Sequence, residues 1–492
     1  MNITQFKYIV KHNLLFIRDK LYPHTLLVGV LLSFLSSCYL IYDHGVVNSS
    51  ALSLLWSLTD GHIGGVASNN TVLAHAIQLL QTTLGIASPE LAGYSLMVIV
   101  HALLTLLIVL ISRQLSFSLL TQWALLFLFL SHPSYDDFRT YIISEPLFWL
   151  MWLTAFYLLI LFYRRHTVFA ILQWLVILVL ASFIDVAAWF WLLLFPFGAL
   201  FWHPWRRRSV LYALLGYAAI VGLLLFLPIY QGVSPFDWLV KTIFSSPEYL
   251  YEALSLGNNN WVEKDNYFMA GVFVFSGAIS LVIIRTLILL NILCLLMAVY
   301  AILRRQYRVM NEDVFRILIY AIGFDVFISV VRLILGEDNT SILSFSTVLL
   351  LLFFSALGLS YTFKKMQARR FSDLTILVIV WCCVAYFASA FIIFGPRRDY
   401  LRVAGETFAQ SYPEAVFYSE RRLVLFYSGR NPDITHTLED AEINALANQR
   451  PVYYGHYKHR RVDLPTVLAD REPVMLFSNR RGDTFYIYRI MP

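Results

Sequence analysis

The chain has 492 residues, of which 59% are hydrophobic and only 14% are charged, against about 25% charged residues in ordinary globular domains. A soluble core cannot hide that much apolar surface, so the composition excludes a soluble globular protein. The formal charge of +6 is scattered over short loops and the C-terminal tail and forms no single stripe. This distribution argues against a nucleic-acid partner.

Apolar runs recur from His24 onward, and each is long enough to cross a hydrocarbon layer about 30 Å thick. We predict about eleven membrane-spanning helices from their length and hydropathy. The predicted spans are residues 24–42, 93–112, 116–131, 146–163, 167–184, 186–202, 209–230, 281–303, 314–335, 341–363 and 373–394. Residues 268–280 are interpreted as a re-entrant or interfacial helix that leads into the eighth span.

Basic residues fall at every second connection between these runs. They are Lys7, Lys11, Arg18 and Lys20; Arg113; Arg164 and Arg165; Arg206, Arg207 and Arg208; Arg304, Arg305 and Arg308; and Lys364, Lys365, Arg369 and Arg370. Because cytoplasmic loops carry the excess of Lys and Arg, this alternation predicts a cytoplasmic N-terminus and an exterior C-terminus.

The long connections, at residues 43–92 and 233–267, fall on the predicted exterior side, as do a shorter loop at 132–145 and a tail from residue 395. In the tail, strand-like stretches at 415–418, 451–454, 474–477 and 484–490 alternate with a helical stretch at 438–448, and residues 481–483 read as a hairpin turn. We therefore predict a mainly α, polytopic transmembrane bundle over residues 1–394 and a small extracytoplasmic α/β domain over residues 395–492. A bacterial inner membrane is compatible with this pattern.

The first exterior loop opens with a carboxylate at the membrane edge, in the sequence Tyr42, Asp43 and His44. Asp43 is either a solvated residue at a helix end or a general base that activates a hydroxyl acceptor at the interface. Two amphipathic stretches follow, at residues 51–58 and 72–84. They predict helices lying on the bilayer surface.

The second exterior loop is short and densely polar. It contains Asp136, Asp137 and Arg139, then Tyr141, and it ends at Ser144, Glu145 and Pro146. Ser144 and Pro146 predict a helix start, where Glu145 suits the positive end of the helix dipole. Paired acids beside a membrane are typical of metal or phosphate chemistry, so Asp136 and Asp137 are candidate functional residues.

Arg285 and Arg332 are charges within or near predicted spans. Each is either a snorkelling side chain or a residue that holds a lipid-linked phosphate by charge-assisted hydrogen bonds.

The layout resembles the GT-C superfamily of membrane glycosyltransferases, including bacterial relatives of the aminoarabinose and protein-mannosyl transferases. The likeness is carried by Asp43 directly after the first span, by the interfacial stretches to residue 84, and by RTYIISEPLF at residues 139–148. In that family a Tyr/Ser-Glu-Pro-Leu-Phe pattern is common before the fourth span. The arginine run at 206–208 and the soluble tail extend the likeness over most of the chain.

This resemblance implies an enzyme that moves a sugar from a polyprenyl-phosphate donor to a glycan, lipid or protein acceptor at the exterior membrane face. It implies Asp43 as the base, Asp136 or Asp137 as an assisting acid or a ligand of a divalent metal, and Arg139 and Arg285 facing the donor phosphate. Arg332 is a further candidate phosphate ligand, and the supporting candidates are His44, Tyr141 and Glu145.

The expected partners are membrane lipid, the lipid-linked donor and an acceptor. Two alternatives stay open. The chain departs from the family at residues 70–74 and at Ile184 and Asp185, which favours a non-catalytic scaffold that keeps the fold. A transporter is less favoured, because it would need broken polar helices in two repeated halves.

Overall fold

A computed structural model of the chain describes residues 24–44, 46–59, 71–165, 168–185, 187–192, 222, 267–334, 340–391 and 399–492. Five described helices are long and apolar enough to cross a membrane: Thr25–Asp43, Pro89–Gln114, Val314–Ile334, Phe345–Gln367 and Asp373–Phe391. They confirm a polytopic membrane protein with a mainly helical fold. The predicted spans 116–131, 146–163 and 167–184 correspond to shorter apolar helices, at Leu119–Leu130, Glu145–Leu161 and Gln173–Ser182.

Two predicted segments lie outside the described residues. They are the span 209–230, apart from residue 222, and the exterior loop 233–267, apart from its last residue. Residues 193–202 of the predicted sixth span lie outside them as well. The count of eleven spans and the sidedness of the loops therefore stay predictions.

The chain divides into two compact units. The bundle unit comprises the described residues of Met1–Val30, Leu103–His132 and Leu147–Phe387. The loop–tail unit comprises those of Leu31–Ala102, Pro133–Pro146 and Ala388–Pro492. The simpler division at residues 394 and 395 stays a prediction.

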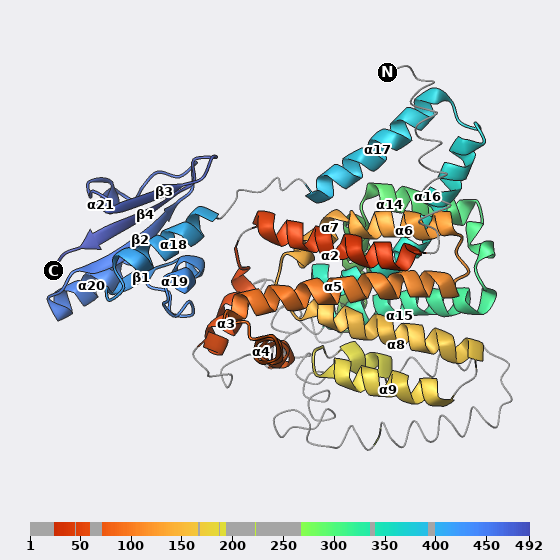
Figure 1. The fold of residues 1–492 in the computed structure, drawn as a ribbon, viewed down its shortest axis with the longest axis horizontal. Helices are drawn as coiled ribbons and strands as arrows, with labels where there is room; N and C mark the ends of the chain where they lie inside the picture. The colour runs from red at the N-terminus through yellow and green to blue at the C-terminus, as the bar shows by residue number, and fades with distance from the viewer. Residues whose placement is uncertain are drawn as a thin grey trace. The chain divides into compact units, whose positions relative to one another are not determined.

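Helix α16 (Thr340–Gln367) is in contact with four other helices of the bundle unit, whose described helices are labelled in Figure 1. Against it pack α6 (Leu119–Leu130), α13 (Tyr267–Leu290), α14 (Ile292–Leu303) and α15 (Glu312–Ile334). The unit also contains α8 (Glu145–Arg165), α9 (Val168–Ser182), the 3-10 turn Gln306–Val309 and most of α17 (Asp373–Phe391). At Gly358 of α16 a Cβ atom would collide with the backbone carbonyl of Met297 in α14, so the absence of a side chain permits this close packing.

Asn291 breaks the long apolar segment that precedes residue 304. Helix α13 runs without interruption from Tyr267 to Leu290, and the chain then turns by 103° into α14. The predicted helix boundary near residue 280 is wrong, because the break lies at Asn291; the bent pair of helices is a broken span or a re-entrant segment. Asn291 has φ 64°, which an α-helix cannot accommodate, and its side chain accepts a hydrogen bond from Leu293 N at 3.3 Å. Asparagine tolerates positive φ better than most residues and is a good N-cap, so it ends one helix and begins the next.

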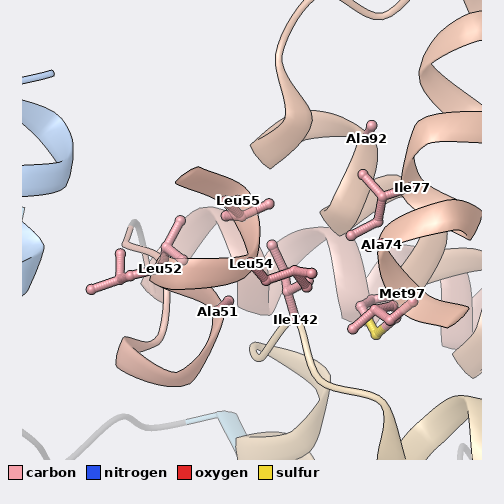
Figure 2. Close-up of a cluster of buried hydrophobic side chains, with 11 residues drawn as sticks. Ala51, Leu52, Leu54, Leu55, Ala74, Ile77, Ala92, Met97 and Ile142 are labelled. Atoms are coloured by element: carbon pink, nitrogen blue, oxygen red, sulfur yellow. The ribbon is translucent and has the colours of Figure 1, made fainter. Parts of the chain in front are cut away.

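The first loop forms two short helices, as the amphipathic stretches predict. They are α3 (Leu52–Thr59), which follows the 3-10 turn Ser49–Ala51, and α4 (Thr71–Leu84). They connect α2 (Thr25–His44) to α5 (Pro89–Gln114). Leu54, Leu55, Ala74 and Ile77 face one another, and Ile142 of the second loop joins the same cluster (Figure 2). Apolar side chains from both loops thus share one small core.

The tail contains a four-stranded sheet in the order β1-β2-β4-β3. The strands are β1 (Phe417–Ser419), β2 (Val452–Lys458), β3 (Met475–Ser478) and β4 (Thr484–Ile490). β1 pairs parallel with β2, and the other pairs are antiparallel. The predicted strands, the helix α20 (Leu438–Asn448) and the hairpin turn, in which Gly482 has φ 90°, are confirmed.

Helices cover both faces of this sheet. α18 (Asp399–Ser411) and α19 (Arg422–Tyr427) pack with Tyr453, Phe485 and Ile487 on one face. α20 and α21 (Thr466–Ala469) pack with Tyr454 and Tyr488 on the other. Because successive side chains of a strand point to opposite faces, β2 and β4 supply both cores. The tail is therefore a small α/β domain, as predicted.

Candidate functional site

Asp136 and Arg139 form a buried ion pair on one short helix. Helix α7 (Pro133–Arg139) places them one turn apart, with Arg139 Nη1 3.4 Å from Asp136 Oδ1. The Arg139 side chain is fully buried and that of Asp136 is 8% exposed. Arg139 Nη1 also donates to Ser36 Oγ of α2 at 3.2 Å. The pair therefore ties the second loop to the middle of α2.

Two aromatic residues complete this network. The Arg139 guanidinium lies 4.8 Å from the centre of the Tyr135 ring, within range of a cation–π interaction. The Tyr135 hydroxyl is 2.7 Å from His101 Nδ1, and Ser33 Oγ donates to the His101 carbonyl at 3.1 Å. Burial raises the pKa of Tyr135 above its ordinary value, so the hydroxyl keeps its proton.

His101, Ser36 and Asn48 are members of this region that the sequence analysis missed. Asn48 Oδ1 accepts a hydrogen bond from Ile142 N at 3.0 Å and so joins the first loop to the second. The sequence could have indicated His101, because it lies in the middle of an apolar run and ionisable residues inside membrane spans usually have a functional or structural partner. Serine and asparagine in a loop carry no comparable signal.

The other predicted residues of the two loops lie close in sequence to this network. Asp43 is in the last turn of α2 and is partly exposed. Tyr141 and Glu145 are partly buried, and Glu145 begins α8, as the helix-start pattern predicts. His44 ends α2 and Asp137 lies in α7, but their side chains lie outside the described residues.

Arg285 and Arg332 belong to the bundle unit. Arg332 Nη1 is 2.9 Å from Asp185 Oδ1, and both side chains are 14% exposed. Asp325, two turns earlier on α15, accepts hydrogen bonds from Ser346 Oγ at 2.5 Å and Thr347 Oγ1 at 2.6 Å. Arg285 lies exposed on α13. A single site made by both arginines together with the loop residues therefore stays a prediction.

The tail is attached to the first loop through α19. The Tyr427 hydroxyl donates to Glu90 Oε1 of α5 at 3.0 Å and accepts from Val47 N at 3.2 Å. Burial raises the pKa of Tyr427, which keeps this hydroxyl protonated and able to donate. Arg422 pairs with Asp433, and both bond to Ser53 of α3.

No group of three or more His, Cys, Asp or Glu side chains within the described residues could hold a metal ion. Asp136 already faces a guanidinium, which competes with a cation for the same carboxylate. A divalent metal stays a prediction.

No protein-family model and no curated protein matches the sequence. Among solved structures, the fold is similar to the crystal structure of ArnT from Cupriavidus metallidurans in the apo state, with 11% identity and a TM-score of 0.40. The alignment covers 94% of this chain and 97% of that chain. At this identity and TM-score the likeness carries no information about the reaction or the substrate.

Proposed function

We propose that the chain is a membrane glycosyltransferase that moves a sugar from a polyprenyl-phosphate donor to an acceptor at the extracytoplasmic face. One observation carries the proposal: the end of α2 with Asp43, helix α7 with Asp136 and Arg139, and the tail domain belong to one compact unit. The resemblance of the loop motifs to the GT-C superfamily points in the same direction.

The reaction asks for a base and for neutralisation of the phosphate that leaves. Asp43, partly exposed at the end of α2, takes the proton of the acceptor hydroxyl as that oxygen attacks the anomeric carbon of the sugar. The bond between that carbon and the phosphate oxygen breaks, and the polyprenyl phosphate leaves with the electron pair. Nearby guanidinium groups stabilise the charge that develops on the phosphate.

The three candidate arginines are not equally accessible for this task. Arg139 and Arg332 already pair with Asp136 and Asp185, and their side chains are 0% and 14% exposed, so a donor phosphate has little access to either of them. Arg285 is exposed and binds a phosphate without such an exchange. In the proposed function Arg285 makes the first contact with the donor, and Arg139 chiefly holds the second loop against α2.

The test is transfer from polyprenyl-phosphate sugars by the purified full chain and by Asp43→Asn. Loss of a general base lowers the rate by about 10²- to 10⁴-fold, and we expect a fall in that range. Asp373→Asn, an exposed acid at the start of α17, is the matched control and should keep full activity. Full activity of Asp43→Asn would exclude Asp43 as the base.

The buried Asp136–Arg139 pair also favours the second candidate, a non-catalytic scaffold, because two of the predicted site residues satisfy each other. Failure of every lipid-linked donor to bind would favour the scaffold. Sidedness is tested separately, by labelling a cysteine placed at exposed Ile434 with a membrane-impermeant reagent on intact cells. Protection of that cysteine would overturn the predicted orientation.

A further inference from the structure

One end of the tail sheet carries a concentration of positive charge on two adjacent loops. The loop after β2 and the turn between β3 and β4 together form the basic edge. Its members are Lys458, His459, Arg460, Arg461, Arg480 and Arg481. The four arginines are exposed, and Lys458 and His459 are partly exposed.

Asp483 holds these two loops together. Lys458 pairs with Thr484 at the end of the β2–β4 ladder. Just beyond it, Asp483 Oδ1 accepts from Arg460 N at 3.1 Å, and Asp483 Oδ2 accepts from Asn479 Nδ2 at 2.9 Å. Asp483 is 2% exposed. The Asp483 carboxylate therefore accepts hydrogen bonds within the domain, whereas the four arginine side chains of the basic edge are exposed.

The acids near the basic edge leave an excess of positive charge. His459 Nε2 lies 3.7 Å from Asp483 Oδ1, and exposed Asp463 follows the cluster two residues after Arg461. The basic edge thus contains five lysine and arginine side chains against these two acids. Guanidinium groups match phosphate oxygens in a forked geometry, so the ligand class that fits is a phosphate-bearing anion.

The first helix of the tail, α18, begins at the same end of the sheet. Tyr400, in the first turn of α18, lies beside Tyr457 and Asp483, and its pKa is raised by burial first and by these two neighbours second. Eight residue positions separate Asp399 from Phe391, the last residue of α17, and they span at most about 29 Å.

A second connection to the membrane-spanning helices starts from this end. The Arg421 guanidinium lies 3.9 Å from the centre of the Tyr457 ring. Arg421 directly precedes α19, the helix that contacts α3 and, through Tyr427, Glu90 at the start of α5. The first turn of α18 and the start of α19 thus both lie beside the end of the sheet that carries the basic edge.

We propose that the basic edge is a binding surface for the phosphate groups of anionic lipid headgroups. Lipid is favoured over a soluble anion because the edge lies beside the start of α18, which follows the membrane-spanning helix α17 along the chain, and beside the docking helix α19. Clustered basic residues close to an anionic membrane are attracted to its phosphate groups. The attraction extends over roughly one Debye length, about 8 Å at physiological ionic strength. This binding is independent of sugar transfer.

The test is amide hydrogen exchange of the full chain in nanodiscs, with zwitterionic lipid alone or with added phosphatidylglycerol. Peptides covering residues 456–464 and 478–484 should exchange several-fold more slowly with the anionic lipid. High salt should remove the difference, because it screens the attraction. Arg460→Glu/Arg461→Glu should abolish it. Arg480→Gln/Arg481→Gln, which leaves the first loop unchanged, should reduce it.

The matched control carries the same charge change at the opposite end of the sheet. Arg450→Glu/Arg489→Glu replaces two exposed arginines beside the start of β2 and the end of β4, and it should keep the lipid effect. Exchange of the β4 core peptide checks that each variant is folded. The proposal is overturned if the anionic lipid has no effect on the wild type, or if both double-glutamate variants lose the effect equally. It is also overturned if inorganic phosphate in zwitterionic nanodiscs slows exchange as much as the anionic lipid does, since that identifies a site for soluble anions.

Discussion

The charged side chain of Arg139 is fully buried, and its neighbours compensate for the loss of contact with water. Asp136 supplies the opposite charge, Ser36 an oxygen, and Tyr135 an aromatic face. Removing a charged group from water costs several kcal/mol, which partners of this kind offset. An arginine in this position is therefore tied to its neighbours, and changing one partner affects the others.

At the residue scale we predict that Arg139→Met destabilises the loop–tail unit by about 3–5 kcal/mol, because it leaves the Asp136 carboxylate buried without its charge partner. The measurement is thermal or urea unfolding of the full chain in detergent. The double variant Asp136→Asn/Arg139→Met should recover part of the loss, since no buried charge remains. Equal stability of Arg139→Met and the wild type would show that the pair contributes nothing.

Helix α19 is the element that joins the tail to the first loop. It is only six residues long, yet Leu423, Phe426 and Tyr427 all pack on the apolar core of α3 and α4. Gly405 of α18 lies behind it, where a Cβ would come within 2.8 Å of Tyr427 Cβ and Val424 O. The close packing of α18 and α19 thus depends on a glycine. This packing positions the Tyr427 side chain for its hydrogen bonds to Glu90 and Val47.

At the element scale we predict that Tyr427→Phe weakens this attachment by about 2 kcal/mol, because it leaves Glu90 without its hydroxyl donor and Val47 N without its acceptor. The Val47 amide should then exchange with solvent roughly thirty-fold faster. Tyr486→Phe, a similar change at a partly buried tyrosine of β4, is the control and should leave Val47 unaffected. Unchanged exchange at Val47 in Tyr427→Phe would contradict the proposed attachment.

At the scale of the whole molecule, the stability of the tail depends on pH, because the tail contains titratable groups with shifted pKa values. Burial lowers the pKa of His456, so the folded tail favours the neutral imidazole. Hydrogen bonds from the Asn479 side chain and the Arg460 backbone lower the pKa of Asp483. Both shifts destabilise the folded tail as the pH falls.

We therefore predict that the tail loses stability in two stages on acidification. The first begins near the unfolded histidine pKa of about 6.5 and the second near the unfolded aspartate pKa of about 3.9. The contribution of Asp483 is present above that second value and is lost as the pH falls through its lower folded pKa. The measurement is the reactivity, in urea, of a cysteine placed at buried Ala445 in a variant without the four native cysteines.

His456→Asn should remove the first stage. Asp483→Asn should reduce the second, to which Asp440 also contributes because hydrogen bonds from Thr437 lower its pKa. A urea midpoint that is the same at pH 7.5 and pH 5 would refute the assignment of His456, and one that is the same at pH 5 and pH 2.5 would refute that of Asp483.

The sequence by itself determined that the protein spans a membrane several times, that its first loop forms two amphipathic helices, and that its tail alternates strands and helices. These properties depend on local composition and periodicity, which each segment carries on its own. The strand stretches near 452 and 484 and helix 438–448 could be placed for that reason. The break at Asn291 could not, because one polar residue in an apolar run gives a weak signal until its φ angle is known.

Only the tertiary structure decided which charges meet. Arg139 and Asp136 are three residues apart, yet Ser36 and His101 of the same network lie far away in sequence. Arg332 was a candidate phosphate ligand, and the fold brings Asp185 to it across 147 residues. Such pairs depend on how helices pack, and a one-residue rotation of a helix changes every partner. The sequence therefore identified the membrane protein, and the packing of its helices selected the partners of its buried charges.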